Sequence, residues 1–176
     1  RLHQSGFKVI PITGRPAGWC DHIARMWPVD GVVGENGAFY FRYDEKQKRM
    51  HRVYAQDAAT RHRNSERLKS LATKVMAHFP GTALASDQAY REIDVAIDFC
   101  EDVPALPLAS AQAIADMFHK AGAEAKVSSI HVNAWFGDHN KLSMSLQMLR
   151  DCFGIGAADA KRAVAYGIGH DLGNLA

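Results

Sequence analysis

The sequence predicts an α/β fold in which a strand–helix–strand unit is interrupted by an inserted segment with an antiparallel sheet. Residues 1–42 alternate short apolar strands with a helix, and residues 134–176 return to a loop, a helix and a strand. Residues 43–133 combine helices with a strand of alternating polarity. We therefore expect residues 1–42 and 134–176 to form one domain and residues 43–133 another.

The composition is that of an ordinary globular protein. The 176 residues are 47% hydrophobic and 23% charged, with a formal net charge of +2. This balance argues against a nucleic-acid surface, and no apolar run approaches the ~18 residues of a membrane span. The three cysteines are far apart and lack metal-ligand spacing. We therefore expect reduced thiols, no signal peptide and a cytoplasmic protein.

The junction after the first predicted strand is a candidate anion site. Residues 7–12 are mostly apolar, which predicts a buried strand, and residues 17–26 have helical spacing. Between them, Thr13 adds a hydroxyl, Gly14 lets the backbone come close, and Arg15 adds a positive charge. Free amides at a helix start attract anions. The tetrapeptide Thr13-Gly14-Arg15-Pro16 also fits an ordinary strand–turn–helix junction.

The next elements are predicted from turn signals and periodicity. Residues 32–33 begin a short strand, Glu35-Asn36-Gly37-Ala38 forms a turn, and residues 39–41 supply the returning strand. Residues 44–52 are charged and predict a solvated turn between strands. Residues 58–79 predict a long amphipathic helix.

Residues 92–99 alternate strictly between apolar and polar side chains, which predicts a strand of an antiparallel sheet with one open side. Glu92, Asp94 and Asp98 on the polar side fit solvation, a cationic ligand or a metal. Residues 110–121 predict a helix, and residues 124–135 a further strand.

A helix is predicted to begin after Asp138 or Asn140 and to end at Gly154. Lys141 then lies in its first turn, where a cation opposes the helix dipole. A bound anion would explain that placement, and so would simple exposure to solvent. Residues 164–166 predict a last strand, followed by a glycine-rich loop that is a weak cofactor signal.

Three stretches carry a resemblance to a known family. Residues 9–16, 33–38 and 129–141 resemble the haloacid dehalogenase (HAD) superfamily of phosphohydrolases. Within it they are most similar to subfamily IIB, which holds mannosyl-3-phosphoglycerate, sucrose-phosphate and Cof-type sugar phosphatases. The first stretch matches the second family motif, a strand that ends in Thr or Ser. The second matches the Glu-Asn-Gly-Ala turn, and the third the approach to the motif that carries a Lys.

The resemblance implies a partial Rossmann-like core, a parallel sheet with flanking helices, and an inserted α+β cap over the active site. It implies a Mg²⁺-dependent phosphatase that hydrolyses a phosphate monoester of a sugar or sugar-glycerate. The expected partner is a small phosphorylated substrate, with no nucleic acid and no membrane.

The resemblance also assigns site residues. Thr13 and Lys141 would be catalytic, and Gly14, Arg15 and Asn36 would hold the phosphate. In the cap, the substrate contacts would be Arg91, His131 and Asn133. His131 fits equally well as a packed interface residue.

Two departures from the family pattern stand against these matches. The family's nucleophile lies in an Asp-x-Asp-Gly-Thr segment, which the 176 residues do not contain. We expect that segment to precede Arg1, in a chain that begins partway through a βαβ unit, and we expect the 176 residues to have negligible phosphatase activity. The fourth motif, which holds Mg²⁺, is atypical here, so Asp171 and Asn174 fit either metal ligands or a plain surface loop.

Two other classes of function remain open. One is a non-enzymatic module that binds a phosphosugar or a partner protein. The other is a nucleotide-binding regulatory domain, which the lack of a full glycine fingerprint disfavours.

Overall fold

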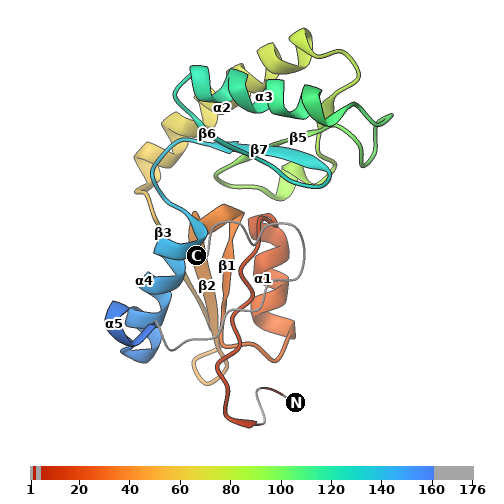
Figure 1. The fold of residues 1–176 in the computed structure, drawn as a ribbon. Coiled ribbons are helices and arrows are strands. Elements are labelled where there is room, and N and C mark those ends of the chain that lie inside the picture. Colours follow the sequence, from red (N-terminus) through yellow and green to blue (C-terminus); the bar gives the residue numbers. More distant parts are fainter. Residues whose placement is uncertain (1, 3–4, 161–176) are drawn as a thin grey trace. The chain divides into compact units, whose positions relative to one another are not determined.

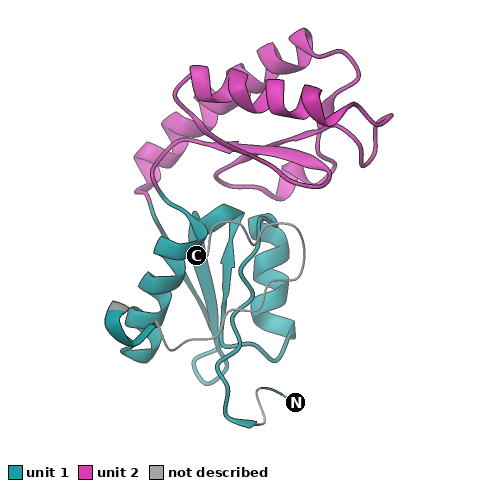
Figure 2. Cartoon of the chain, in the orientation of Figure 1, with its two compact units in different colours: residues 1–55, 139–168, 174–176 teal, residues 56–138, 169–173 magenta. Residues whose placement is uncertain are grey.

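The structure is a computed structural model that describes residue 2 and residues 5–160 (Figure 1). Contacts divide the chain into two units (Figure 2). Among the described residues, the first unit comprises residues 2, 5–55 and 139–160, and the second comprises residues 56–138. The boundaries expected from the sequence, after residues 42 and 133, lie before the observed ones, which follow residues 55 and 138. Residues 43–55 stay with the first unit because they include a strand that pairs with its sheet.

The first unit contains a three-stranded antiparallel sheet with the order β1-β2-β3. The strands are β1 (Val32–Gly34), β2 (Phe39–Asp44) and β3 (Arg49–Tyr54), and a short turn, η2 (Glu35–Gly37), joins the first two. The helices are α1 (Ala17–Met26), α4 (Lys141–Phe153) and α5 (Ala157–Ala160).

The two longer helices lie on opposite faces of this sheet (Figure 1). Met144 and Met148 of α4 pack on Val33 and Tyr40, which share one face. Successive side chains of a strand point to opposite faces, so Phe39 and Phe41 turn toward α1. Their rings stack at a centroid distance of 4.2 Å.

The predicted strand at residues 7–12 is only partly confirmed. Residues 9–13 run parallel to β1, with one bridge between Ile12 and Val33. The Val33 amide donates to the Pro11 carbonyl at 2.9 Å, and the Thr13 amide donates to the Val33 carbonyl at 3.0 Å. The stretch is not a buried strand, however, since Phe7 is 62% exposed. Among the described residues, this stretch pairs with β1 on one side. Pro11 has no amide hydrogen and cannot donate to a second strand.

The predicted ends of α4 are confirmed. Asn140 is the N-cap, and its side chain accepts from the Ser143 amide at 2.9 Å, while the Ser143 hydroxyl accepts from the Asn140 amide at 3.1 Å. This reciprocal pair satisfies backbone donors that the helix start leaves without intrahelical partners. Gly154 ends the helix in a left-handed conformation, with φ of 67°.

The second unit packs two helices on one face of a four-stranded antiparallel sheet (Figure 1). Its helices are α2 (Ala58–His78) and α3 (Leu108–Lys120), with a short turn, η3 (Gln88–Tyr90). The strand order is β4-β5-β7-β6. The strands are β4 (Ala83–Leu84), β5 (Val95–Asp98), β6 (Glu124–Val127) and β7 (His131–Trp135).

The core of this unit confirms the predicted helix face and strand alternation. Leu68 and Val75 of α2 pack with Val95 and Ile97 of β5 and with Phe118 of α3. The prediction of one strand over residues 124–135 was wrong. Those residues form the β6–β7 hairpin, because Ser128 turns the chain and its amide donates to the His131 carbonyl at 2.8 Å.

Two further observations concern the cysteines and the helices. Cys20, Cys100 and Cys152 form no disulfide. Among residues 5–160, no helix has the length and apolar character that crossing a lipid bilayer requires. The strand predicted at residues 164–166 and the glycine-rich loop after it lie outside the described residues.

A prediction for the first unit concerns Gly34, which has no space for a side chain. A Cβ there would overlap the Phe39 ring and lie 2.6 Å from Sγ of Cys20. Because Phe39 and Cys20 are fully buried, Gly34→Ala should lower the free energy of unfolding by about 1–3 kcal/mol. Urea denaturation followed by tryptophan fluorescence measures this loss. Gly156→Ala is the control, since a Cβ there meets nothing within 4 Å, and equal midpoints for the two variants would contradict the prediction.

Candidate functional site

The loop from Thr13 to Ala17 is tied down by the η2 turn. The Asn36 amide donates to the Thr13 carbonyl at 3.2 Å, and the Glu35 amide donates to the Arg15 carbonyl at 3.2 Å. The Thr13 hydroxyl oxygen accepts from the Arg15 amide at 3.1 Å. The loop predicted to hold a phosphate therefore has a defined backbone path in the first unit.

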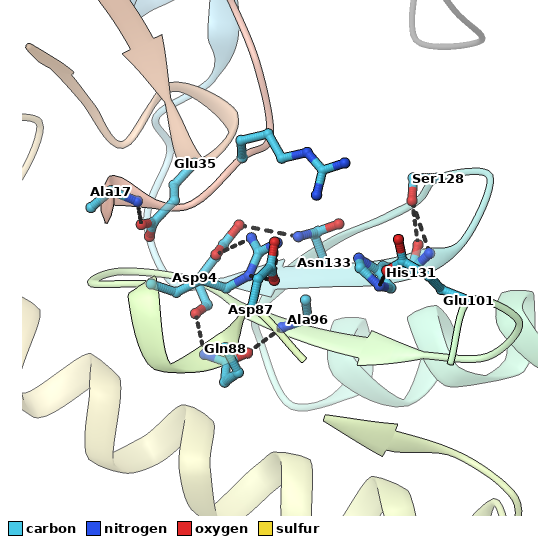
Figure 3. A network of polar contacts seen from close by, with 12 residues as sticks. Ala17, Glu35, Asp87, Gln88, Asp94, Ala96, Glu101, Ser128, His131 and Asn133 are labelled. Carbon is cyan, nitrogen blue, oxygen red and sulfur yellow. Dashed lines mark hydrogen bonds and ion pairs between the residues drawn. The ribbon is translucent and has the colours of Figure 1, made fainter. Parts of the chain in front are cut away.

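Glu35 is a residue whose importance the sequence analysis missed. Its side chain is fully buried, and its carboxylate accepts from the Ala17 amide at 2.8 Å (Figure 3). Ala17 is the first residue of α1, so the carboxylate caps that helix. The first amide of α1 is thus taken by the chain's own anion. The sequence did carry a signal for this cap. Glu35 is an acid in a turn between two apolar strands, and the preceding helix starts after Pro16, whose side chain cannot cap it.

The η2 turn also adopts an unusual backbone conformation. Glu35 has φ of 40° and Asn36 has φ of 58°, in the left-handed region that side chains disfavour. Gly37 follows with φ of 101°. Three successive residues in this region reverse the chain sharply between β1 and β2.

Both segments predicted to hold the phosphate meet at this turn. A Cβ on Gly14 would lie 3.0 Å from Oδ1 of Asn36, so the Asn36 side chain lies against the Thr13–Gly14 backbone. A Cβ on Gly37 would overlap the carbonyl of Asn140 and lie 2.6 Å from the amide nitrogen of Lys141. The start of α4 therefore packs directly on the turn. Convergence of the Thr13 hydroxyl and the Lys141 ammonium on one ligand stays a prediction.

The polar side of the second unit's sheet differs from the prediction of an open face. Every residue of β5 and β7 is buried, including Asp98, His131 and Asn133. Buried polar groups require partners, since each unsatisfied one costs about 1–3 kcal/mol. The partners come from the loops on either side of β5, and they form two clusters.

The first cluster, of which Figure 3 labels Asp87, Gln88, Asp94 and Asn133, surrounds Arg91. Its side chain is 2% exposed and makes ion pairs with Asp94 at 2.9 Å and Asp87 at 3.1 Å. Asn133 donates through Nδ2 to the second oxygen of Asp94 at 3.3 Å. Gln88 donates to the Asp94 carbonyl and accepts from the Ala96 amide. The cation that Asp94 meets is therefore an arginine of the same chain.

The second cluster surrounds Asp98 at the other end of β5. Its carboxylate accepts from the amides of Cys100, Glu101 and Asp102, at 2.8–2.9 Å. Burial alone would raise the pKa of Asp98, but these amides and nearby His131 outweigh it, so the pKa lies below its ordinary value. His131, which pairs with Asp98 across the sheet, places Nε2 2.8 Å from the Glu101 carboxylate.

The structure thus distributes the predicted site residues over both units. The first unit holds Thr13, Gly14, Arg15, Asn36 and Lys141, and the second holds Arg91, His131 and Asn133. The predicted metal ligands, Asp171 and Asn174, lie outside the described residues. Across the described part of the chain, no cluster of three or more His, Cys, Asp or Glu side chains is placed to hold a metal ion.

A hollow in the second unit involves none of these residues. It has a volume of about 460 Å³ and runs along α2. The Arg67 guanidinium lies 3.7 Å from the centroid of the Phe136 ring in its lining. This contact is a cation–π pair between α2 and the residue that follows β7.

Comparison with solved structures confirms the α/β fold class. A protein from Thermoplasma acidophilum matches with a TM-score of 0.63 and 11% identity, over 90% of this chain and 61% of that one. The sucrose-phosphatase of Synechocystis, solved with sucrose and phosphate, matches with a TM-score of 0.55 and 14% identity, over 86% and 59%. A HAD subclass IIB sugar phosphatase matches with a TM-score of 0.56 and 12% identity, over 90% and 67%.

The chain therefore spans about three fifths of the length of the first two of these structures. At such low identity, the likeness establishes the fold alone. No family model matches the sequence, and a search of the curated proteins finds no match.

The Asp98 cluster predicts a pH-dependent stability. Asp98→Asn removes the charge that three amides stabilise, and it should lower the free energy of unfolding at pH 7 by about 1–3 kcal/mol. The folded-state pKa lies below the ordinary 3.8, so the carboxylate's contribution is complete above that value and is lost as the pH falls through the folded-state pKa. The difference between wild type and variant should shrink below about pH 4. Urea denaturation across a pH series measures it, and a difference that persists undiminished in acid would contradict the assignment.

The Arg91 cluster predicts a large cost for removing the cation. Arg91→Met should lower the free energy of unfolding by about 3–5 kcal/mol, because the fully buried Asp94 carboxylate would lose its counter-charge. Lys69→Met is the matched control, since Lys69 pairs with Glu66 on the surface, where solvent screens the pair and its loss should hardly change stability. Equal denaturation midpoints for the two variants would refute the buried pair.

Proposed function

We propose that this chain binds the phosphate group of a sugar phosphate or sugar-glycerate phosphate, as part of a HAD-type phosphatase site. One observation carries the proposal: the Thr13–Gly14 loop and the start of α4, which bears Lys141, meet at a single turn. Sugar phosphatases are among the solved structures with this fold. The motifs at residues 9–16, 33–38 and 129–141 point to the same class of substrate.

The chain's own residues supply the means to hold a phosphoryl group. The Thr13 hydroxyl donates to a phosphoryl oxygen, and Gly14 lets that oxygen approach the backbone. Arg15 and Lys141 add positive charge, and the Asn36 amide group adds donors beside Gly14. Because Glu35 occupies the first amide of α1, the ligand is held by these groups rather than by that amide.

The full reaction would need two further components. Mg²⁺ would neutralise charge on the phosphoryl oxygens, with Asp171 and Asn174 as the proposed ligands. An aspartate nucleophile would attack phosphorus, yet the sequence contains no Asp-x-Asp-Gly-Thr segment. We therefore assign binding without turnover to the 176 residues. We also propose a cytoplasmic location, which fits the reduced thiols expected from the sequence.

The second unit would serve as the cap that selects the sugar. Arg91, His131 and Asn133 are the proposed contacts, and the structure shows what holds each in place. Arg91 and Asn133 are both bonded to Asp94, and His131 lies against Glu101. Side chains with such partners have few rotamers open to them, which favours recognition of a rigid, hydroxyl-rich ligand.

The alternative is a module that binds a phosphosugar or a partner protein and belongs to no enzyme. The missing nucleophile segment favours such a module over an enzyme, and the lack of a full glycine fingerprint disfavours a nucleotide-binding regulatory domain. Turnover separates the two classes. A longer chain that includes an Asp-x-Asp-Gly-Thr segment and hydrolyses sugar phosphates would establish the enzyme.

Phosphate binding tests the proposal directly. Titration calorimetry with inorganic phosphate should show saturable binding by the 176-residue chain. Thr13→Val and Lys141→Met should each weaken it by about 10- to 100-fold, as expected for the loss of a charge-assisted hydrogen bond of 1.5–3 kcal/mol. Lys69→Met, on the surface of the second unit, should bind like wild type.

The same samples test turnover. With p-nitrophenyl phosphate and Mg²⁺, the chain should release no product above background. Robust turnover that Lys141→Ala abolishes would overturn the assignment of binding without catalysis. An absence of phosphate binding by the folded wild-type protein would overturn the proposed function itself.

A further inference from the structure

The η2 turn holds the candidate phosphate loop at three points. The Asn36 amide bonds the Thr13 carbonyl, the Glu35 amide bonds the Arg15 carbonyl, and the Glu35 carboxylate receives the Ala17 amide. These bonds reach the loop at every second residue from 13 to 17. Two consecutive residues thus fix the whole path on which the Thr13 hydroxyl and Gly14 depend.

The opposite side of the turn fixes the other half of the site. Gly37 lies so close to Asn140 and Lys141 that only a hydrogen fits in place of a side chain. A shift of the turn would therefore move the start of α4 or open a gap beneath it. The spacing between the Thr13 loop and Lys141 is set by one three-residue element.

The backbone of the turn indicates that this geometry is imposed. Glu35 and Asn36 both have positive φ, which costs non-glycine residues roughly 1–2 kcal/mol each. Such conformations persist where the surroundings over-determine them, and they concentrate at binding sites. Asn tolerates this region, whereas Glu has no such preference. The buried carboxylate–amide bond to Ala17 offsets the strain at Glu35.

We propose that Glu35 is a positioning residue for the phosphate site. Its carboxylate holds the turn in its strained conformation, and the turn holds the Thr13–Gly14 loop and the Lys141 end of α4 at the separation that a phosphate needs. Glu35 itself does not touch the ligand. This inference rests on the proposed function, since it assigns a cause to the geometry of the same site.

Two substitutions separate positioning from charge. Glu35→Gln keeps an oxygen that accepts from the Ala17 amide. Its Kd for inorganic phosphate should therefore lie within about threefold of the wild-type Kd. Glu35→Ala removes the acceptor and should raise the Kd for phosphate at least tenfold. Calorimetry at a temperature where circular dichroism shows both variants folded gives these values.

Two further variants exclude a purely structural effect. Val53→Ala removes core packing from β3 at a position that pairs with Tyr40, outside the turn, so it should lower the melting temperature and leave the Kd unchanged. Gly37→Ala should resemble Glu35→Ala, because it forces the start of α4 away from the turn. Amide hydrogen exchange should accelerate at Ala17 and Asn36 in Glu35→Ala and stay slow in Glu35→Gln.

The outcomes distinguish the two proposals. If wild type binds phosphate and Glu35→Ala binds it equally well, Glu35 is no positioning residue, and the proposed function stands. If folded wild type binds no phosphate, the proposed function fails and the role of Glu35 fails with it. A Kd raised equally by Val53→Ala and Glu35→Ala would also refute positioning, because general destabilisation would then explain both.

Discussion

The hydrogen bond from the Ala17 amide to the buried Glu35 carboxylate is the constraint on which the first unit's candidate site depends. A carboxylate without solvent must be compensated, and the start of α1 provides a fixed amide and a favourable dipole. That bond stabilises the strained η2 turn, which contacts both the Thr13 loop and the start of α4. Local backbone strain, helix capping and site geometry are therefore aspects of one interaction.

The second unit handles buried polarity in a different way. Its sheet has a conventional apolar face under α2 and α3, but its other face carries acids, an amide and an imidazole that are also buried. Each acid has its own compensation: Asp94 has the Arg91 guanidinium, and Asp98 has three backbone amides. Such a face is costly to bury unless every polar group is satisfied, so these bonds fix the register of the strands and the orientation of their polar side chains.

A shared fold and a shared function are separate statements for this protein. The α/β architecture is common to sugar phosphatases that are 12–14% identical to this chain, and so low an identity says nothing about chemistry. Function has to be argued from the site, where the contacts among the Thr13 loop, the η2 turn and the start of α4 are specific. The chemistry proposed for them is the holding of a phosphate, which needs donors and positive charge but no nucleophile.

The sequence alone determined the elements whose signals are local. Helical periodicity gave α1, α2 and α4, strict alternation gave β5, and Gly154 marked a helix end, because period and backbone freedom are properties of neighbouring residues. Only the tertiary structure decided that residues 124–135 fold back as a hairpin, that the polar side of β5 is buried, and that Glu35 caps a helix 18 positions earlier in the chain. Those outcomes depend on which distant groups come together, and a buried acid and a solvated one look identical until its partner is known.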